Sequence, residues 1–204
     1  MKNDLSNATV DALLRSMSIA VVNYERNKEL LQKLPHKRLL DLAVIIKWRL
    51  DSDNNEQEIP EFINVNNEMI KAWGVDADTL INIAMINSKR LSSAMLIPFN
   101  QFLFDEYSEC DRIFVLTNSS LINGAALVCY DEILEFVYNR FEGDYYLIPS
   151  SVNEMLAFES DEILEIQMMK DVLKNVNSDV LSADEYLSDN IYYYNGCTKT
   201  LKIV

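Results

Sequence analysis

The chain has 204 residues, of which 49 % are hydrophobic and 25 % are charged, and it holds only four Gly and four Pro. This composition excludes a disordered or collagen-like chain and supplies enough apolar residues for one sizeable core. The net charge is −14: residues 1–100 hold 12 Lys/Arg and 13 Asp/Glu (net −1), whereas residues 101–204 hold 6 and 19 (net −13). Such a negative field repels nucleic acid and anionic membranes and attracts basic protein surfaces. The alternative is that the charge serves solubility alone.

The first half of the chain predicts a helix followed by strands. Apolar residues at helical spacing indicate a short amino-terminal helix or extension over 1–17, and 18–22 then has an extended pattern. A helix is predicted over 24–34, because Pro35 stops it. Period-two alternation over 39–50 predicts one long strand, and the polar stretch after it leads to a second strand at 61–65, as in a hairpin with a long loop.

The second half alternates strands and helices without a regular repeat. A helix over 67–73 ends at Gly74, and Asp76 caps the next helix. The remaining predicted elements are strands at 95–98, 111–117, 144–148, 154–158, 190–194 and 199–204, helices at 120–141 and 161–175, and a turn at Asn195-Gly196. Because hairpins are mixed with helices, we predict an α+β fold, with an antiparallel or mixed sheet covered by helices, as a single domain over 18–204.

Localisation follows from what the chain lacks. No apolar run approaches the roughly 20 residues of a membrane span, and the acidic start with Asp4 and Asp11 does not fit a secretory signal. Cys110, Cys129 and Cys197 are widely spaced without a C-x-x-C pair, which indicates free thiols. We therefore expect a cytoplasmic protein that has no direct contact with a membrane.

Several catalytic and cofactor-binding sites lack their residues. The dispersed glycines supply no phosphate-binding loop, and one His with three scattered Cys supplies no zinc site. A Ser or Cys nucleophile would need His36, the single histidine, which we interpret as the residue at the entry of a strand. We expect no cofactor and no metal, and these absences favour a protein that is not an enzyme.

Two polar stretches remain as a candidate site. Thr117 to Ser119 can cap the predicted helix, whose unpaired N–H groups could bind an anion. The stretch 148–154 is a polar corner between two strands. Ordinary capping and turn chemistry is the more common explanation of both stretches. The candidate residues of this polar corner are Asn118, Ser119, Asn123, Asp144, Ser150, Ser151, Asn153 and Glu154.

Two further sets are candidates for partner binding. Glu159, Asp161, Glu162 and Glu165 form an acidic helix start, although negative charge there also stabilises a helix. The run Tyr192, Tyr193 and Tyr194 exposes at least one ring if it forms an edge strand. That ring would belong either to a contact surface or to an ordinary amphipathic edge.

The order of five segments resembles a known family. They read YERNKELLQKLPHKRLLDLAVIIKWRL, NNEMIKAWGVDADTLINIA, FVLTNSSLINGAALVCY, YYLIPSSVNEMLAF and LSDNIYYY. Together they resemble a bacterial domain-of-unknown-function family that is common in anaerobic gut Gram-positive bacteria and their mobile elements. The match spans about residues 18–195, without the family's amino-terminal segment.

The resemblance implies an α+β fold and a cytoplasmic setting, and it transfers no activity. The family's corner often reads S-S-x-H-E, where this chain has Ser150, Ser151, Val152, Asn153 and Glu154. If that histidine acts as a general base in relatives, this chain lacks it, because Asn does not titrate.

Three functions fit these observations. First in rank is a non-catalytic binding or regulatory protein whose acidic carboxy-terminal half engages a basic protein partner, with inhibition of a nucleic-acid-handling host-defence protein as a concrete version. A structural or dimer-forming module that uses the tyrosine-rich tail comes second. A hydrolase or nuclease-like enzyme with a diffuse carboxylate site at Asp144, Ser151 and Glu154 comes third.

Overall fold

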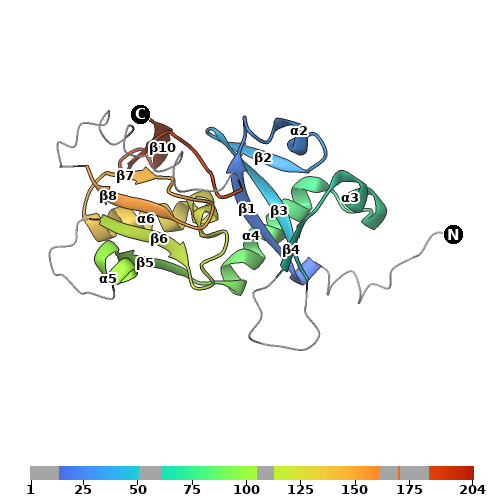
Figure 1. The fold of residues 1–204 in the computed structure, drawn as a ribbon, viewed down its shortest axis with the longest axis horizontal. Coiled ribbons are helices and arrows are strands. Elements are labelled where there is room, and N and C mark those ends of the chain that lie inside the picture. Colours follow the sequence, from blue (N-terminus) through green and yellow to red (C-terminus); the bar gives the residue numbers. More distant parts are fainter. Residues whose placement is uncertain (1–13, 51–60, 105–112, 161–169, 171–183) are drawn as a thin grey trace.

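Two antiparallel sheets flanked by helices make up the described part of the computed structural model, which comprises residues 14–50, 61–104, 113–160, 170 and 184–204 (Figure 1). The predicted α+β class is confirmed, with two sheets where one was expected. Both sheets contribute to one hydrophobic core, as expected of a single domain.

The first sheet is built around one long strand. Strand β3 pairs with β1 along one edge, and its other edge is shared by β2 and then β4. The alternation of β3 places Leu42, Val44 and Ile46 toward the main core, whereas Ala43 and Ile45 face a second small cluster. The strands are β1 (Met17–Asn23), β2 (His36–Leu39), β3 (Leu42–Leu50) and β4 (Glu61–Asn64).

Two predictions in this region are wrong. The segment predicted as one strand over 39–50 begins as a hairpin, because Leu40 adopts φ 56° and turns the chain, so that Leu39 pairs with Leu42. The helix predicted over 24–34 is only the four-residue α2 (Lys28–Leu31). It starts late because Oδ1 of Asn23 accepts a hydrogen bond from Arg26 N, which holds the preceding residues in a turn.

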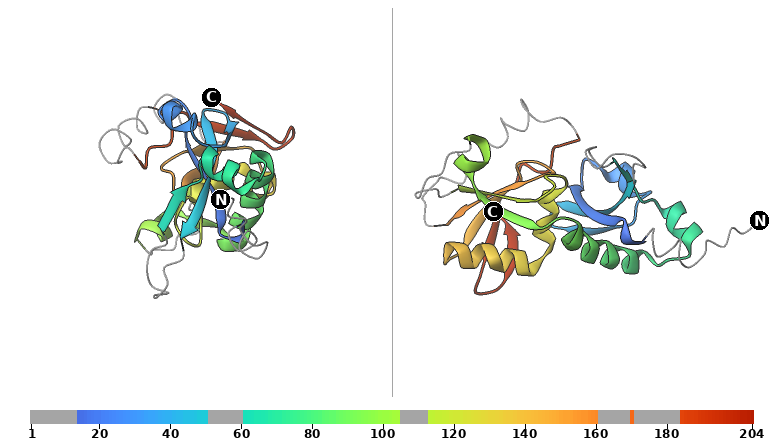
Figure 2. Two further views of the ribbon diagram at one scale, coloured as in Figure 1. Left: turned by 90° about the vertical axis from the view of Figure 1, so that its right-hand side faces the viewer. Right: turned by 90° about the horizontal axis from the view of Figure 1, so that it is seen from below.

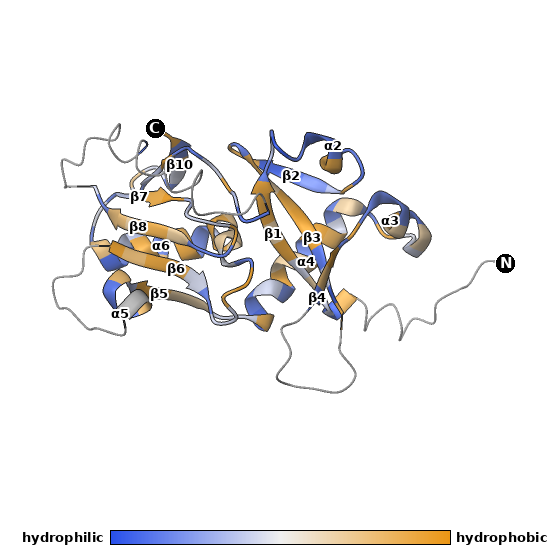
Figure 3. Ribbon diagram, viewed as in Figure 1, coloured by the Kyte–Doolittle hydropathy of each residue, from blue (hydrophilic) through white to orange (hydrophobic). Residues whose placement is uncertain are grey.

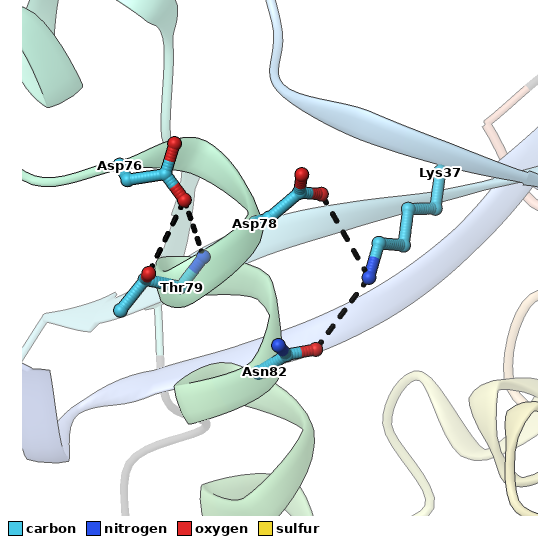
Figure 4. Close-up of polar contacts among 5 residues, drawn as sticks. All are labelled: Lys37, Asp76, Asp78, Thr79 and Asn82. Carbon is cyan, nitrogen blue, oxygen red and sulfur yellow. Dashed lines mark hydrogen bonds and ion pairs between the residues drawn. The ribbon is translucent and has the colours of Figure 1, made fainter.

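Two helices follow, α3 (Asn67–Trp73) and α4 (Ala77–Leu91), with the predicted caps. Gly74 ends α3 in the left-handed conformation at φ 67°. Asp76 caps α4 by accepting hydrogen bonds from N and Oγ1 of Thr79, at 3.0 and 3.2 Å (Figure 4). Leu80, Ile81 and Ala84 of α4 are buried in the main core, where α4 packs on β1 and β3.

The second sheet has the order β10-β9-β7-β8-β6-β5, with every neighbouring pair antiparallel. Helix α6 covers one face, where the hydroxyl of Tyr145 donates to the carbonyl of Leu134. The remaining elements are β5 (Ala94–Pro98), α5 (Phe99–Phe104), β6 (Ile113–Asn118), α6 (Asp131–Phe141), β7 (Tyr145–Ile148), β8 (Met155–Glu159), β9 (Tyr192–Asn195) and β10 (Thr200–Ile203).

The helix predicted over 120–141 is broken into two pieces. A 3₁₀ helix, η1 (Gly124–Cys129), comes first, and the extended backbone of Tyr130 separates it from α6. Asn123 precedes η1 in the left-handed region at φ 54°. The break lets η1 insert into the main core beside β1 and β6, with Ala125 and Val128 buried.

The hydropathy of the strands follows their environment (Figure 3). Strands β1 and β3 and the central strands of the second sheet are apolar, and β2 at the rim is polar. The predicted hairpin at the carboxyl end is confirmed, but Asn195 pairs with Thr200, so residues 196–199 form the loop. In the part that the structure describes, no helix is long and apolar enough to cross a membrane.

Candidate functional site

The polar corner at 149–154 is closed by its own hydrogen bonds. The hydroxyls of Ser150 and Ser151 both donate to Oε1 of Glu154, at 2.8 and 2.6 Å. A main-chain hydrogen bond closes the same turn, since Ser151 N donates to the carbonyl of Glu154 at 3.2 Å. The Glu154 carboxylate is thus engaged in holding the turn between β7 and β8.

Asn153 ties this corner to the segment between β6 and η1. Its Oδ1 accepts from Asn123 N at 3.0 Å, and its carbonyl accepts from Oγ1 of Thr117 at 2.8 Å. The approach is so close that a Cβ on Gly124 would lie 2.2 Å from that carbonyl and 2.4 Å from the Thr117 hydroxyl. Glycine is therefore required at this contact, because any side chain would overlap the corner.

The helix start that was predicted at Thr117 to Ser119 is not present. Residues 118–120 end β6 and form a turn, so no helix begins there. The N–H groups that would bind the anion are already used: Ser119 N donates to the carbonyl of Ser93, and Ser120 N donates to Oγ of Ser92. The side chain of Asn118 stabilises the same turn, accepting from Ser120 and donating to the carbonyl of Ile122.

Asp144 does not join the corner. It lies at the opposite end of β7, where its carboxylate accepts from the Tyr193 hydroxyl, from Nδ2 of Asn195 at 2.8 Å and from Gly196 N at 2.9 Å. These hydrogen bonds, led by that of Tyr193, lower the pKa of Asp144. Of the predicted corner residues, the structure links Asn123 to the turn formed by Ser150, Ser151, Asn153 and Glu154. Asn118 and Ser119 bond instead within their own turn and to Ser92 and Ser93, and Asp144 anchors the β9–β10 hairpin.

The tyrosine run alternates between the two faces of its sheet. Tyr192 and Tyr194 are buried in the core, and burial raises the pKa of both phenols. Tyr193 faces the other way, half-buried against the ring of Tyr146. The strand lies between β7 and β10, so the expectation of an edge strand is wrong. Glu159 ends β8 and is half-buried, whereas Asp161, Glu162 and Glu165 lie outside the described residues.

Asp41 is a polar centre that sequence reasoning missed. From the turn between β2 and β3, its carboxylate accepts from Oγ of Ser188 at 2.5 Å, Nδ2 of Asn190 at 2.9 Å and the Tyr192 hydroxyl at 2.6 Å. These bonds tie the first sheet to the segment that leads into β9. No local pattern reveals them, because the partners are some 150 residues away along the chain.

His36 and Cys129, two groups that could act as a base or a nucleophile, are both held in structural positions. His36 begins β2 as predicted, and Nδ1 of its ring lies 3.0 Å from the carbonyl of Leu34. Burial of the Cys129 sulfur raises its pKa to about 12, which keeps the thiol protonated and unreactive. Across the described ranges, no three His, Cys, Asp or Glu side chains gather as a metal site requires.

A cavity of about 70 Å³ lies where β1 meets the 118–130 segment. Two polar-corner residues, Asn118 and Asn123, line it, together with Ser18 of β1, Arg49 of β3 and Lys89 of α4. Ser18 is only 8 % exposed, and its Oγ has no hydrogen-bond partner among the described residues. The cavity thus combines segments that lie far apart in sequence.

Ser18 belongs to a polar row across the first sheet. It pairs with Lys47 of β3, which pairs on its other side with Asn64 of β4. The Oδ1 atom of Asn64 is also buried without a described partner. Burial lowers the pKa of the Lys47 ammonium, an effect that the Asp184 carboxylate partly offsets. Positive charge therefore gathers on this face, since Arg49 projects from the same side of β3.

A second hollow, of about 390 Å³, lies between α4 and α6. The two helices follow one another along the same side of the molecule (Figure 2). Met85 and Ile86 of α4 and Tyr130, Asp131 and Glu132 line the hollow. The Lys89 ammonium pairs with Glu132 across it. We call this surface the α4–α6 hollow.

Comparison with protein families finds one match that covers most of the chain. The model of a family of unknown function, DUF5688, matches residues 5–196. The chain belongs to the DUF5688 family. The predicted membership in an uncharacterised family is thereby confirmed, with a match that starts upstream of the expected residue 18, while the bacterial host range of DUF5688 stays a prediction. No curated protein and no solved structure matches the chain.

Proposed function

We propose that the protein is a non-catalytic binding protein that docks a basic segment of a protein partner in the α4–α6 hollow. The observation that carries this proposal is the combination of exposed apolar and acidic groups there. Ile86 at 59 % and Phe136 at 53 % are the most exposed large apolar side chains of the described residues. Ile86 lines the hollow, and Phe136 lies one helical turn beyond Glu132 on α6.

Charge complementarity selects a basic occupant. Asp131, Glu132 and Glu135 are exposed along the first turns of α6. Lys89 and Lys199 pair with two of these carboxylates, but ion pairs between exposed side chains contribute little and exchange readily with a partner's Lys or Arg. The net charge of −14 favours encounter with a basic surface at long range.

A nucleic-acid-handling protein fits this chemistry. Its phosphate-binding face is rich in Lys and Arg, and apolar or aromatic residues often lie among them. A partner bound through that face could not bind nucleic acid at the same time. Inhibition by occlusion is the regulatory outcome of this proposal.

The occupied polar groups support a role without catalysis. Glu154 and Asp144 each accept hydrogen bonds that hold a turn or hairpin, and they lie at opposite ends of β7. A hydrolytic site needs its acid, base and nucleophile within hydrogen-bond reach of one substrate. These two carboxylates do not meet that requirement together.

The test is affinity capture from the native host with cross-linking, at low and at moderate salt. We expect a basic partner cross-linked to α4 or α6, released as salt rises because the attraction is screened. Ile86→Ser should weaken capture strongly, whereas Leu30→Ser, which also removes an exposed aliphatic side chain but from α2 outside the hollow, should leave it unchanged. Capture that is insensitive to salt or to Ile86→Ser contradicts the proposal, as does a purely homodimeric assembly through this surface.

A further inference from the structure

The cavity at β1 shares Lys89 and Tyr130 with the α4–α6 hollow, but its other lining residues differ and are rich in hydrogen-bond donors. The Ser18 hydroxyl, the Arg49 guanidinium and the Asn123 carboxamide make no hydrogen bond with another described residue. Asn118, 9 % exposed, uses one N–H of its Nδ2 on the carbonyl of Ile122 and retains a second. Among the described residues that line the cavity, none is Asp or Glu.

The Ser18 hydroxyl is the most informative of these groups. A buried polar atom without a partner destabilises the protein, and such atoms are rare in folded chains. In the polar corner, by contrast, the hydroxyls of Ser150 and Ser151 both have partners inside the chain. A hydroxyl that has none, at the wall of a cavity, is suited to a ligand.

The charge at the cavity also favours a ligand. Arg49 projects from the same face of the sheet as Lys47, whose pairing partner on β1 is Ser18. It makes no ion pair with any described residue, although the chain has 32 Asp and Glu. An unpaired guanidinium presents a planar fork of donors, the geometry that binds carboxylate or phosphate through two parallel hydrogen bonds.

We propose that this cavity binds a small oxyanion, the phosphate or carboxylate group of a small molecule, with Arg49 as its charge partner. Ser18, Asn118 and Asn123 donate hydrogen bonds to it. The apolar side chains of Ile19, Phe62 and Leu127, which also line the cavity, contact the rest of the molecule. Because a water needs roughly 10–15 Å³ of internal volume, about 70 Å³ accommodates an oxyanion with a few attached carbon atoms.

The test is an NMR titration of the ¹⁵N-labelled chain with inorganic phosphate, with acetate, and with chloride at matched ionic strength. We expect saturable shifts of the amides of Ile19, Ser120 and Asn123 with at least one oxyanion and none with chloride. Comparing phosphate with acetate identifies the preferred head group. Shifts that chloride reproduces, or no saturable shift with either oxyanion, overturn the proposal.

Variants locate the site. Arg49→Gln should weaken binding by about tenfold or more, because it removes a charged hydrogen-bond partner. Arg90→Gln removes the same charge from an exposed residue of α4 that does not line the cavity, and it should leave the affinity unchanged. Arg49 is itself exposed at the mouth, so its variant should remain folded. Equal affinities of these two variants would rule out this site.

Discussion

Two polar regions meet where β6 ends, and they differ in whether their hydrogen bonds are already made. In the corner at 149–154, Ser150, Ser151 and Glu154 bond to one another. In the neighbouring cavity, the side chains of Ser18 and Arg49 have no described partner. Polar groups that are satisfied within the chain fix its shape, and those that are not remain able to bind something else.

Asn123 connects the two regions. Main-chain atoms of Asn123 bond to the corner, because its N–H donates to Oδ1 of Asn153. Its side chain lines the cavity. The corner therefore acts as the framework that holds the cavity wall in place, and variants of the two regions should have different consequences.

The largest loss of stability is expected at Asp41, whose carboxylate likewise accepts its hydrogen bonds from within the chain. Asp41→Ala leaves the side chains of Ser188, Asn190 and Tyr192 without this acceptor, which should lower the free energy of unfolding by about 3 kcal/mol. Urea denaturation measures it. Asp78→Ala, which removes only an exposed contact of 3.8 Å to Lys37, is the control and should change little. Equal losses of stability for the two variants would show that Asp41 does not hold the first sheet to the segment before β9.

A somewhat smaller loss of stability is expected at Gly124, where η1 packs closely against the polar corner. Gly124→Ala places a methyl group 2.2 Å from the Asn153 carbonyl, and relieving that overlap should destabilise the chain by about 2–3 kcal/mol. Gly143→Ala is the matched control, because its nearest neighbour would be 3.9 Å away. The comparison of thermal unfolding midpoints checks this, and a Gly124→Ala variant as stable as Gly143→Ala contradicts the close packing.

Alkaline pH should lower the stability of the folded state, because its buried tyrosines resist deprotonation. Burial raises the pKa of Tyr145 and Tyr192 above the ordinary value of 10, so the folded state keeps protons that the unfolded state releases. Stability is therefore retained below pH 10 and falls above it, by about 1.4 kcal/mol per pH unit for each such tyrosine. Urea titrations at pH 9 to 11.5 measure the slope. Tyr145→Phe should reduce it by one tyrosine's share, and an unchanged slope would be inconsistent with a buried phenol.

The smallest effect is expected at the surface of α4. Lys37 reaches from β2 to the carboxylate of Asp78 and to Oδ1 of Asn82, at 3.8 and 3.5 Å (Figure 4). Both contacts are exposed, so Lys37→Met should change the free energy of unfolding by less than about 0.5 kcal/mol. A loss above about 1 kcal/mol in urea denaturation would mean that this edge of the first sheet depends on charge.

Short-range features were predictable from the sequence, and long-range ones were not. Asp76 and Gly74 were assigned as caps because their signals are local, and the corner residues from Ser150 to Glu154 were grouped because they are adjacent. The turn at Leu40 carries no Gly, Asn or Pro signal, so a hairpin was read as one strand. The cavity combines Ser18, Arg49 and Asn123 through sheet pairing that no single segment encodes.

The most direct test measures stability and phosphate binding together for Ser18→Ala and Ser151→Ala. Removing the unpartnered Ser18 hydroxyl should raise the free energy of unfolding by roughly 1 kcal/mol and weaken phosphate binding. Removing the Ser151 hydroxyl, which bonds to Glu154, should lower stability by about the same amount and leave binding intact. If Ser18→Ala is less stable and binds phosphate as well as the native chain does, the division between framework and binding groups is wrong.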